Sequence, residues 1–382
     1  MSSTGVAASA TPYLEALRPV VSDVVAPAAA EVDRTGTFPR AGVQALAAAG
    51  LLGLLSGPDV GGQGQGLRAA ALVIEELARH CGSTAMVLLM HYAAVPTVEA
   101  HGSPGVREAV ASGRCLLTLA FSEAGSRSHF WAPVSTATRQ DGQVRLDARK
   151  GWVTSAGEAG GYVWSSQPVD GEGASSLWFV SADAAGLQVT APFDGLGLRG
   201  NSSSPVVAEG VMVAPEAMLG PDGAGLDLMT SLVLPAFQLM SAAFSVGTME
   251  AATVKAAAHV SGTPLEHLGQ SLAELPTVRA YVARMRVGTD MARSLLLDAL
   301  AAVEAGSDDA MLRVLEVKAA AGEAATEVTD LAMRVCGGSA FRREVGVERH
   351  FRDARAAGVM APTTDVLYDF IGRAACGLPV FG

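Results

Sequence analysis

The sequence predicts a mostly helical α+β protein in three parts. These are a helical domain at residues 1–116, a small β-barrel or β-sandwich at 117–222 and a four-helix bundle at 223–382. Apolar residues recur at helical spacing in the first and last parts. Short alternating or β-branched runs separated by turn residues fill the middle part. A chain of 382 residues is also long enough for several domains, each with its own core.

The first part consists of apolar segments separated by turns that contain glycine or proline. Helical spacing predicts helices over residues 13–32, 38–50 and 67–80. The segment 83–98 is strongly apolar, and His91 is its single histidine. A histidine among apolar residues is usually a hydrogen-bonded core residue, although it can also serve as a catalytic base.

The middle part changes from helical spacing to strands. Asp141-Gly142 separates two short β-type runs, which predicts a hairpin because both residues tolerate a positive φ angle. Residues 176–180 and 206–213 are expected to form further strands. Strands this short and this closely spaced predict a small antiparallel barrel or sandwich.

The last part returns to long helices. Residues 228–249 contain no charge, but serine, threonine, glutamine and proline interrupt them, so we expect a buried central helix rather than a membrane span. Ser307-Asp308-Asp309 is a suitable N-terminal cap for a helix that reaches Cys336. Gly337-Gly338 then permits the helix to end.

Composition excludes several classes of function. The net charge is −11 and no basic run occurs, which argues against nucleic acid or an anionic membrane as the main partner. The four cysteines are far apart and form no Cys-x-x-Cys motif, so we expect a reducing compartment and no metal site. The first 13 residues lack the basic start and apolar core of a signal peptide, which favours a cytoplasmic location.

Three motifs near the C-terminus bring polar groups together. They are Cys336-Gly337-Gly338, Arg352-Asp353-Ala354 and Ala361-Pro362-Thr363. Pro362 is expected to open the last helix, whose N-terminus would attract an anion or an electron-rich ring. Together they resemble the Gly-Gly helix stop, the Arg-Asp-Ala and the Glu-Gly-Thr of the acyl-CoA dehydrogenase superfamily.

Two further motifs extend this resemblance into the middle part, so that it covers nearly the whole chain. Leu119–Ser128 is similar to the family's Thr-Glu-Pro-x-x-Gly-Ser-Asp loop, and Lys150–Ser155 is similar to its Lys-x-Trp-Ile-Thr-Asn strand. The resemblance implies the family's three-part fold and bound FAD. It assigns FAD contacts to Phe121, Ser122, Ser128, Trp152, Thr154, Arg334, Gly337, Gly338, Thr363 and Asp365. Thr363 and Asp365 are equally well explained as a helix cap and a first-turn carboxylate.

The resemblance also exposes a departure at the catalytic position. The family's proton-abstracting glutamate falls on Ala361, and an alternative glutamate site falls on Phe237, so neither position carries a carboxylate. Asp365, one helical turn beyond Ala361, and His91 are the candidate replacement bases. Two alternatives stay open: flavin chemistry without such a base, for example a monooxygenase, and acyl-thioester binding without turnover.

The family resemblance implies a substrate class and partners as well. The expected substrate is an acyl thioester, carried on CoA or on an acyl-carrier protein, and the expected reaction is α,β-dehydrogenation. An electron-transfer flavoprotein is the implied electron acceptor. A homodimer or homotetramer is the implied assembly.

Overall fold

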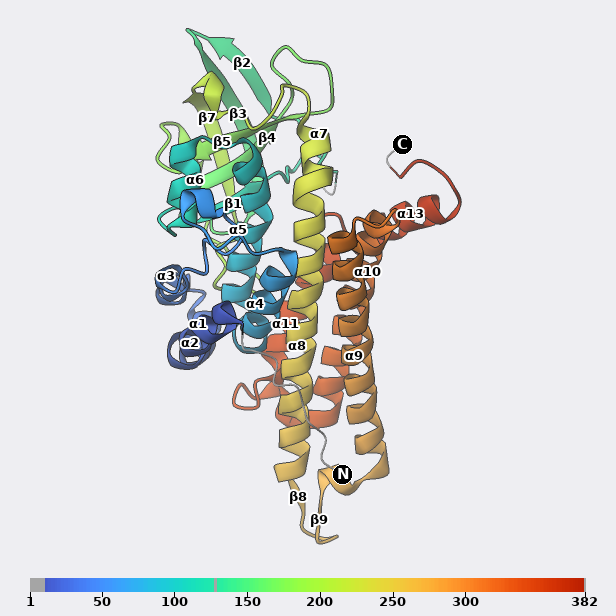
Figure 1. Ribbon diagram of the computed structural model, residues 1–382. Coiled ribbons are helices and arrows are strands. Elements are labelled where there is room, and N and C mark those ends of the chain that lie inside the picture. The colour runs from blue at the N-terminus through green and yellow to red at the C-terminus, as the bar shows by residue number, and fades with distance from the viewer. Residues whose placement is uncertain (1–10, 127–128, 381–382) are drawn as a thin grey trace.

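In the computed structural model, which describes residues 11–126 and 129–380, a small β domain lies between two helical parts of the chain. Figure 1 shows the long helix α8 (Leu234–Gly262) running through the molecule. The N-terminal helices and the β domain lie on one side of α8, and α9 (Pro276–Ala305) and α10 (Ala310–Cys336) lie on the other. The predicted mostly helical α+β fold is confirmed.

The N-terminal part is built around α5 (Gly82–His101), which is buried along nearly its whole length. Its apolar residues cover every side of the helix, so it forms stable contacts only when other elements surround it. The other elements of this part are α1 (Pro12–Pro19), the π-helical segment η1 (Val20–Val25), α2 (Ala26–Thr35), α3 (Arg40–Ala48), the 3₁₀ turn η2 (Pro58–Val60), α4 (Leu67–His80) and α6 (Pro104–Ala111).

The middle part forms two sheets. One has the strand order β1-β4-β5, and the other has the order β2-β3-β7-β6. The strands are β1 (Leu117–Ala120), β2 (Thr136–Gln140), β3 (Gln143–Val153), β4 (Gly161–Ser166), β5 (Ser176–Ser181), β6 (Leu187–Val189) and β7 (Ser204–Val213). Asp141 and Gly142 take φ angles of 51° and 79° in the β2–β3 turn, which confirms the predicted hairpin. The expectation of a purely antiparallel domain is wrong, because β1 pairs with β4 in parallel.

The C-terminal part contains three long helices and a run of short ones, rather than four long helices. Beside α8, α9 and α10, its elements are α7 (Gly225–Leu228), η4 (Met229–Val233), the small hairpin β8–β9 (Pro264–Leu265 and Gln270–Ser271), η5 (Leu272–Glu274), η6 (Gly337–Phe341), α11 (Val347–Ala354), α12 (Ala356–Val359) and α13 (Thr364–Ala375). The 3₁₀ turn η3 (Pro215–Ala217) belongs to the end of the middle part. Helix α10 ends at Cys336, and Gly337 follows with a φ of +56°, as predicted.

Helix α8 is the buried centre of this part. The helical stretch 225–262 is long and apolar enough to cross a membrane, but 89% of its most hydropathic window is buried inside the protein. Gly247 lets α8 approach α4 closely, since a Cβ there would lie 2.2 Å from the Glu75 carbonyl oxygen. The uncharged segment is therefore explained by burial within the helical bundle.

Candidate functional site

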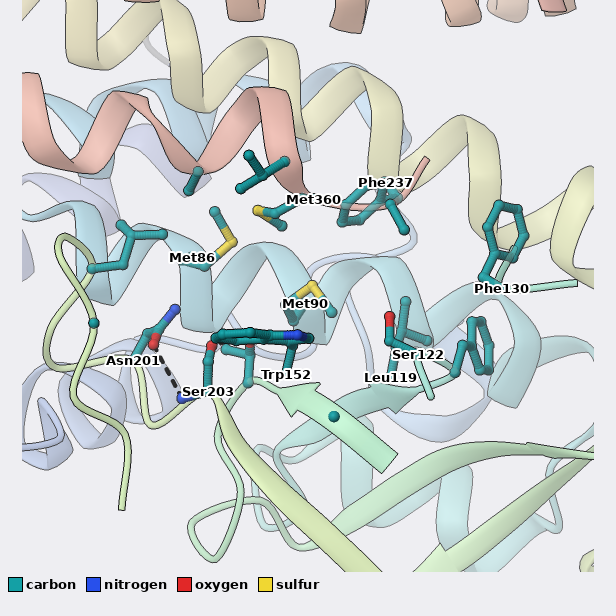
Figure 2. A pocket seen from close by; sticks show the side chains of 18 of the residues that line it. Met86, Met90, Leu119, Ser122, Phe130, Trp152, Asn201, Ser203, Phe237 and Met360 are labelled. Atoms are coloured by element: carbon teal, nitrogen blue, oxygen red, sulfur yellow. Dashed lines mark hydrogen bonds between the residues drawn. The ribbon is translucent and has the colours of Figure 1, made fainter. Parts of the chain in front are cut away.

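A cavity of about 1020 Å³ lies where the three parts of the chain meet, and we call it the central pocket. Residues from α5, the β1–β2 loop, β3, the 193–203 loop, α8 and the α11–α12 segment line it. Figure 2 shows Trp152 and Ser203 along one side of this space, with Met86, Met90, Met360 and Phe237 facing them across it. The pocket therefore has a β-domain wall and a helical wall.

Trp152 dominates the β-domain wall. The pairing of β3 with β7 shifts register between Lys150 and Val153, so the chain bulges at this point. Trp152 takes a φ of +58° there, and 75% of its surface is exposed. Such a backbone conformation is costly for a bulky residue and often marks a functional site. An indole this exposed inside a pocket presents a flat apolar face to a ligand.

A buried ion pair supports this wall from behind. The Lys150 ammonium lies 2.5 Å from a Glu123 carboxylate oxygen and also donates to the Ser165 carbonyl oxygen at 2.7 Å. Glu123 accepts further hydrogen bonds from Ser135 and from the Val134 N–H. Burial, opposed by Glu123, lowers the pKa of Lys150 to about 8. Burial favours neutral Glu123, but Lys150 and the other donors outweigh it and lower the pKa of that carboxyl.

Small polar groups lie beside the indole. The Thr154 hydroxyl is 3.0 Å from the Ser203 hydroxyl, and the Ser203 N–H donates to the Asn201 side-chain oxygen at 3.2 Å. Figure 2 marks the second of these bonds. Ser122 lines the same wall, and within the described chain its hydroxyl has no hydrogen-bond partner. The Gly151 N–H donates to the Ser122 carbonyl oxygen at 2.9 Å, which ties this loop to the bulge.

The helical wall is apolar apart from Arg352 and Arg355, and it carries no acid at the position expected for a base. Ala361 and Phe237 both line the pocket. Of the carboxylates that line it, Glu123 is held by Lys150, and the Asp194 side chain is 90% exposed. The described chain therefore places no available carboxylate beside Ala361.

His91 is removed from the candidate bases by its position. Its ring is fully buried, and Nδ1 accepts a hydrogen bond from the Leu117 N–H at 3.0 Å. Nε2 must then carry the proton, which it donates to the Leu52 carbonyl oxygen at 2.9 Å. Burial lowers the pKa of His91 to about 4. Because both nitrogens are used and the ring does not line the pocket, His91 is a structural residue, and the catalytic interpretation is wrong.

Asp365 and Thr363 also lie off the pocket wall. Pro362 lines the pocket, but α13 begins only at Thr364, and Thr363 takes the N-cap position without a side-chain capping bond. The expectation that Pro362 itself opens the helix is therefore wrong by two residues. Asp365 is exposed and contributes nothing to the pocket lining, so one chain does not bring its carboxylate to the base position.

The other predicted FAD contacts divide into two groups. Phe121, Ser122, Trp152 and Thr154 gather at the central pocket. Arg334, Gly337 and Gly338 are exposed at the far end of α10 and do not line it; the Arg334 guanidinium stacks 4.7 Å from the centre of the Tyr281 ring. The predicted contact at Ser128 lies outside the described residues.

Lys318 was missed by sequence reasoning. It lies on α10 behind the Ala361 turn and is almost fully buried. Asn201 and Ser203 were also not singled out, although the serine-rich run around them was visible. The only signal for Lys318 in the sequence was a cation within an apolar helix face, which is more often a solvated side chain.

The β-domain wall fits FAD. A planar heteroaromatic ring with hydrogen-bonding edges needs an apolar face to lie on and small donors and acceptors at its rim. Trp152 supplies the face, and Ser122 and Thr154 supply uncharged hydroxyls. These residues come from two separate segments, the β1–β2 loop and the end of β3, which the Lys150–Glu123 pair holds together, so the cradle exists before a ligand binds.

Comparisons with known proteins agree with this geometry. The acyl-CoA dehydrogenase N-terminal, middle and C-terminal domain families match residues 11–113, 118–211 and 223–376. The chain is 30% identical over 369 residues to cyclohex-1-ene-1-carbonyl-CoA dehydrogenase of Geobacter metallireducens (strain ATCC 53774 / DSM 7210 / GS-15), covering 94% of this chain and 96% of that protein. It is 26% identical to human mitochondrial short-chain specific acyl-CoA dehydrogenase, over 92% of this chain and 86% of that one.

Solved structures show the same fold. Butyryl-CoA dehydrogenase from Megasphaera elsdenii superposes with a TM-score of 0.89 at 22% identity, covering 95% of this chain and 97% of that one. A structure described as PigA with FAD and proline superposes with a TM-score of 0.89 at 19% identity, covering 98% and 99%. With all three domain families matched in order, the chain belongs to the acyl-CoA dehydrogenase family.

Proposed function

We propose that this protein is an FAD-dependent oxidoreductase that removes two hydrogens from the Cα–Cβ bond of an acyl thioester. The single observation that carries the proposal is the central pocket, whose exposed indole and small hydroxyls face an apolar wall of methionine and phenylalanine. Membership of the acyl-CoA dehydrogenase family and the name of the 30% identical relative support the same reaction.

The residues of the β-domain wall would hold the flavin ring. Trp152 would pack on its face, Thr154 and Ser122 would hydrogen-bond its rim, and Phe121 would close the wall behind it. FAD supplies the two-electron acceptor for the reaction. Arg334, Gly337 and Gly338 lie too far along α10 to serve this pocket, so we assign them to the dinucleotide of a second copy in a homodimer or homotetramer.

The opposite wall would hold the acyl group. Met86, Met90 and Phe237 offer contacts to hydrocarbon. The cations that line the same pocket are Arg352, which is paired with Asp33 and Glu348, and Arg355. The Ala361 N–H has no acceptor within the described chain, so it is free to donate to the thioester carbonyl oxygen. Such a bond stabilises the negative charge that develops on this oxygen when the α-proton leaves.

The α-proton then passes to solvent, because the described chain supplies no carboxylate beside Ala361. A positioned general base typically contributes about 10²–10⁴ in rate. We therefore expect slow turnover compared with an enzyme that has glutamate at this position.

The same missing carboxylate favours one other function, oxygen-dependent hydroxylation of an acyl thioester by externally reduced FAD. That chemistry needs no α-proton base of this kind. Under either function we propose a cytoplasmic protein acting on an acyl group carried by CoA or by a carrier protein. For dehydrogenation we propose an electron-transfer flavoprotein as acceptor.

The test begins with the visible spectrum of the purified protein and FAD quantification after denaturation. Saturated acyl-CoAs of several lengths are then added without oxygen. Bleaching of the flavin band together with formation of an enoyl thioester would support dehydrogenation. Bound FAD that no thioester bleaches, with oxygen consumed only when NAD(P)H and a flavin reductase are added, would support hydroxylation. Bound FAD with neither activity would indicate a binding role, and absence of FAD binding would overturn both enzyme functions.

A further inference from the structure

Lys318 on α10 is a buried cation that no carboxylate neutralises. Its surface is 1% exposed, and within the described chain its ammonium forms no salt bridge. Instead it donates to the carbonyl oxygens of Ala357 at 3.1 Å, Met360 at 3.0 Å and Pro362 at 2.8 Å. An ammonium has three protons, and these three carbonyls accept all of them. Burial lowers the pKa of Lys318 to about 7, whereas the three carbonyl acceptors match the three protons of the charged form. Below this pH a positive charge is therefore held directly behind the turn that carries Ala361.

The Met360–Ala361 peptide unit transmits this charge toward the pocket. The cis peptide bond of this turn is Ala361-Pro362, and the preceding bond is trans. In a trans peptide the C=O and the N–H point in opposite directions. Since the Met360 carbonyl faces Lys318, the Ala361 N–H faces away from it. Ala361 lines the pocket, and its N–H has no acceptor in the described part of the chain.

We infer that Lys318 is a positioning residue that orients and polarises the Ala361 N–H as the donor to the thioester carbonyl oxygen. A charge-assisted hydrogen bond to the Met360 oxygen withdraws electron density from the peptide unit, which makes its N–H a stronger donor. A carbonyl oxygen bound there gains negative charge more readily, which acidifies the Cα–H. The inference rests on the proposed binding of an acyl thioester.

The electrostatic setting strengthens the effect. The ammonium lies 6.0 Å from the centre of the Phe237 ring, and Lys318 is only 1% exposed, so little water surrounds it. A charge in such surroundings is weakly screened. In a site that lacks a carboxylate base, stronger polarisation of the substrate carbonyl is the contribution that the chain can still make to loss of the α-proton.

A purely mechanical role for Lys318 is the competing interpretation. By binding the carbonyl oxygens of Ala357 and Met360, the ammonium also braces the end of α12. Substitution would then loosen the turn without changing how strongly a bound carbonyl is polarised. The two roles differ in the infrared carbonyl band of the bound thioester, because the frequency of this band falls as the C=O bond is polarised.

The experiment compares the FAD-loaded wild type with Lys318→Met and Lys318→Gln, both of which remove the charge. Gln keeps a donor for the Met360 oxygen. Lys255→Met is the matched control, because it removes a partly buried lysine whose ammonium contacts His350 rather than the Ala361 turn. Difference infrared spectra are recorded with an acyl-CoA carrying ¹³C at the thioester carbonyl. Binding of the corresponding thioether, which has no carbonyl, measures the integrity of the pocket.

We expect the carbonyl band to move to lower frequency when the thioester binds to wild type and Lys255→Met. Both Lys318 variants should lose at least half of that shift and still bind FAD and the thioether. A full shift in either folded Lys318 variant would overturn the inference and leave a bracing role. If the thioester binds to wild type without any shift of its carbonyl band, the inference about Lys318 is overturned as well, but the proposed function is not affected. Failure of wild type to bind any thioester would overturn both. If Lys318→Met does not fold, Lys318→Gln decides.

Discussion

The buried pair Lys150–Glu123 should be essential to the β-domain wall, and Lys150→Met tests this. Both side chains are almost fully buried, and the ammonium donates to Glu123, Ser165 and Ser135. Removing one member of a buried pair leaves an uncompensated charge, which costs about 3–5 kcal/mol. Glu123 keeps its bonds from Ser135 and the Val134 N–H, so we expect the lower end of this range.

The assay is the apparent free energy of unfolding in urea at a fixed, saturating FAD concentration. Lys150→Met should lower it by about 3 kcal/mol, and Glu123→Leu by a similar amount. The double variant Lys150→Met/Glu123→Leu removes both charges and should be more stable than the sum of the two losses predicts, by about 1–3 kcal/mol. The singles should also release FAD more readily, because the Trp152 bulge follows Lys150 directly. Wild-type stability in Lys150→Met, or additive losses in the double variant, would refute the argument.

Three further predictions concern other parts of the molecule. Trp152→Ala should weaken FAD binding at least tenfold and Trp152→Phe should weaken it much less, as measured by fluorescence titration of FAD. Equal FAD affinity in wild type and both variants would contradict a stacking role for Trp152. His91→Ala should lower the unfolding free energy by about 2–4 kcal/mol, because it opens a cavity and leaves two buried backbone groups unpaired, with unchanged turnover per bound FAD. Burial opposes ionisation of Asp222, but hydrogen bonds from Ser176 and the N–H groups of residues 169–171 outweigh it and lower the pKa to about 2. The stabilisation by ionised Asp222 is therefore complete above pH 3.8 and is lost as the pH falls through 2. In Asp222→Asn this part of the pH dependence of the melting temperature should disappear, and a wild-type profile would contradict the prediction.

The fold was predictable because the sequence features that determine its elements lie in short stretches of adjacent residues. The Asp141-Gly142 turn, the end of α10 at Gly337 and the uncharged run of α8 each follow from the conformational or burial preference of a few adjacent residues. The same holds for Trp152 and Thr154, because the motif that carries them also forms the strand that places them at the pocket.

The site could be predicted less well where a role depends on distant partners. His91 has the sequence surroundings of either a core histidine or a base, and only its bonds to Leu52 and Leu117 decide between them. In a continuous helix, Asp365 would lie one turn beyond Ala361. The chain is not helical from Met360 to Thr363, however, so Asp365 lies at the surface instead. The parallel pairing of β1 with β4 joins segments some 40 residues apart, and no adjacent residue indicates it.

The most direct test of the central claim is the anaerobic rate at which a saturated acyl-CoA bleaches the flavin in Ala361→Glu, with Ala361→Gln as the isosteric control. If the substrate Cα lies beside residue 361 and only the base is missing, Ala361→Glu should exceed wild type by about 10²–10⁴, and Ala361→Gln should not. Equal rates in the wild type and both FAD-loaded variants, or bleaching in none of them, would contradict the placement of an acyl thioester between Trp152 and Ala361.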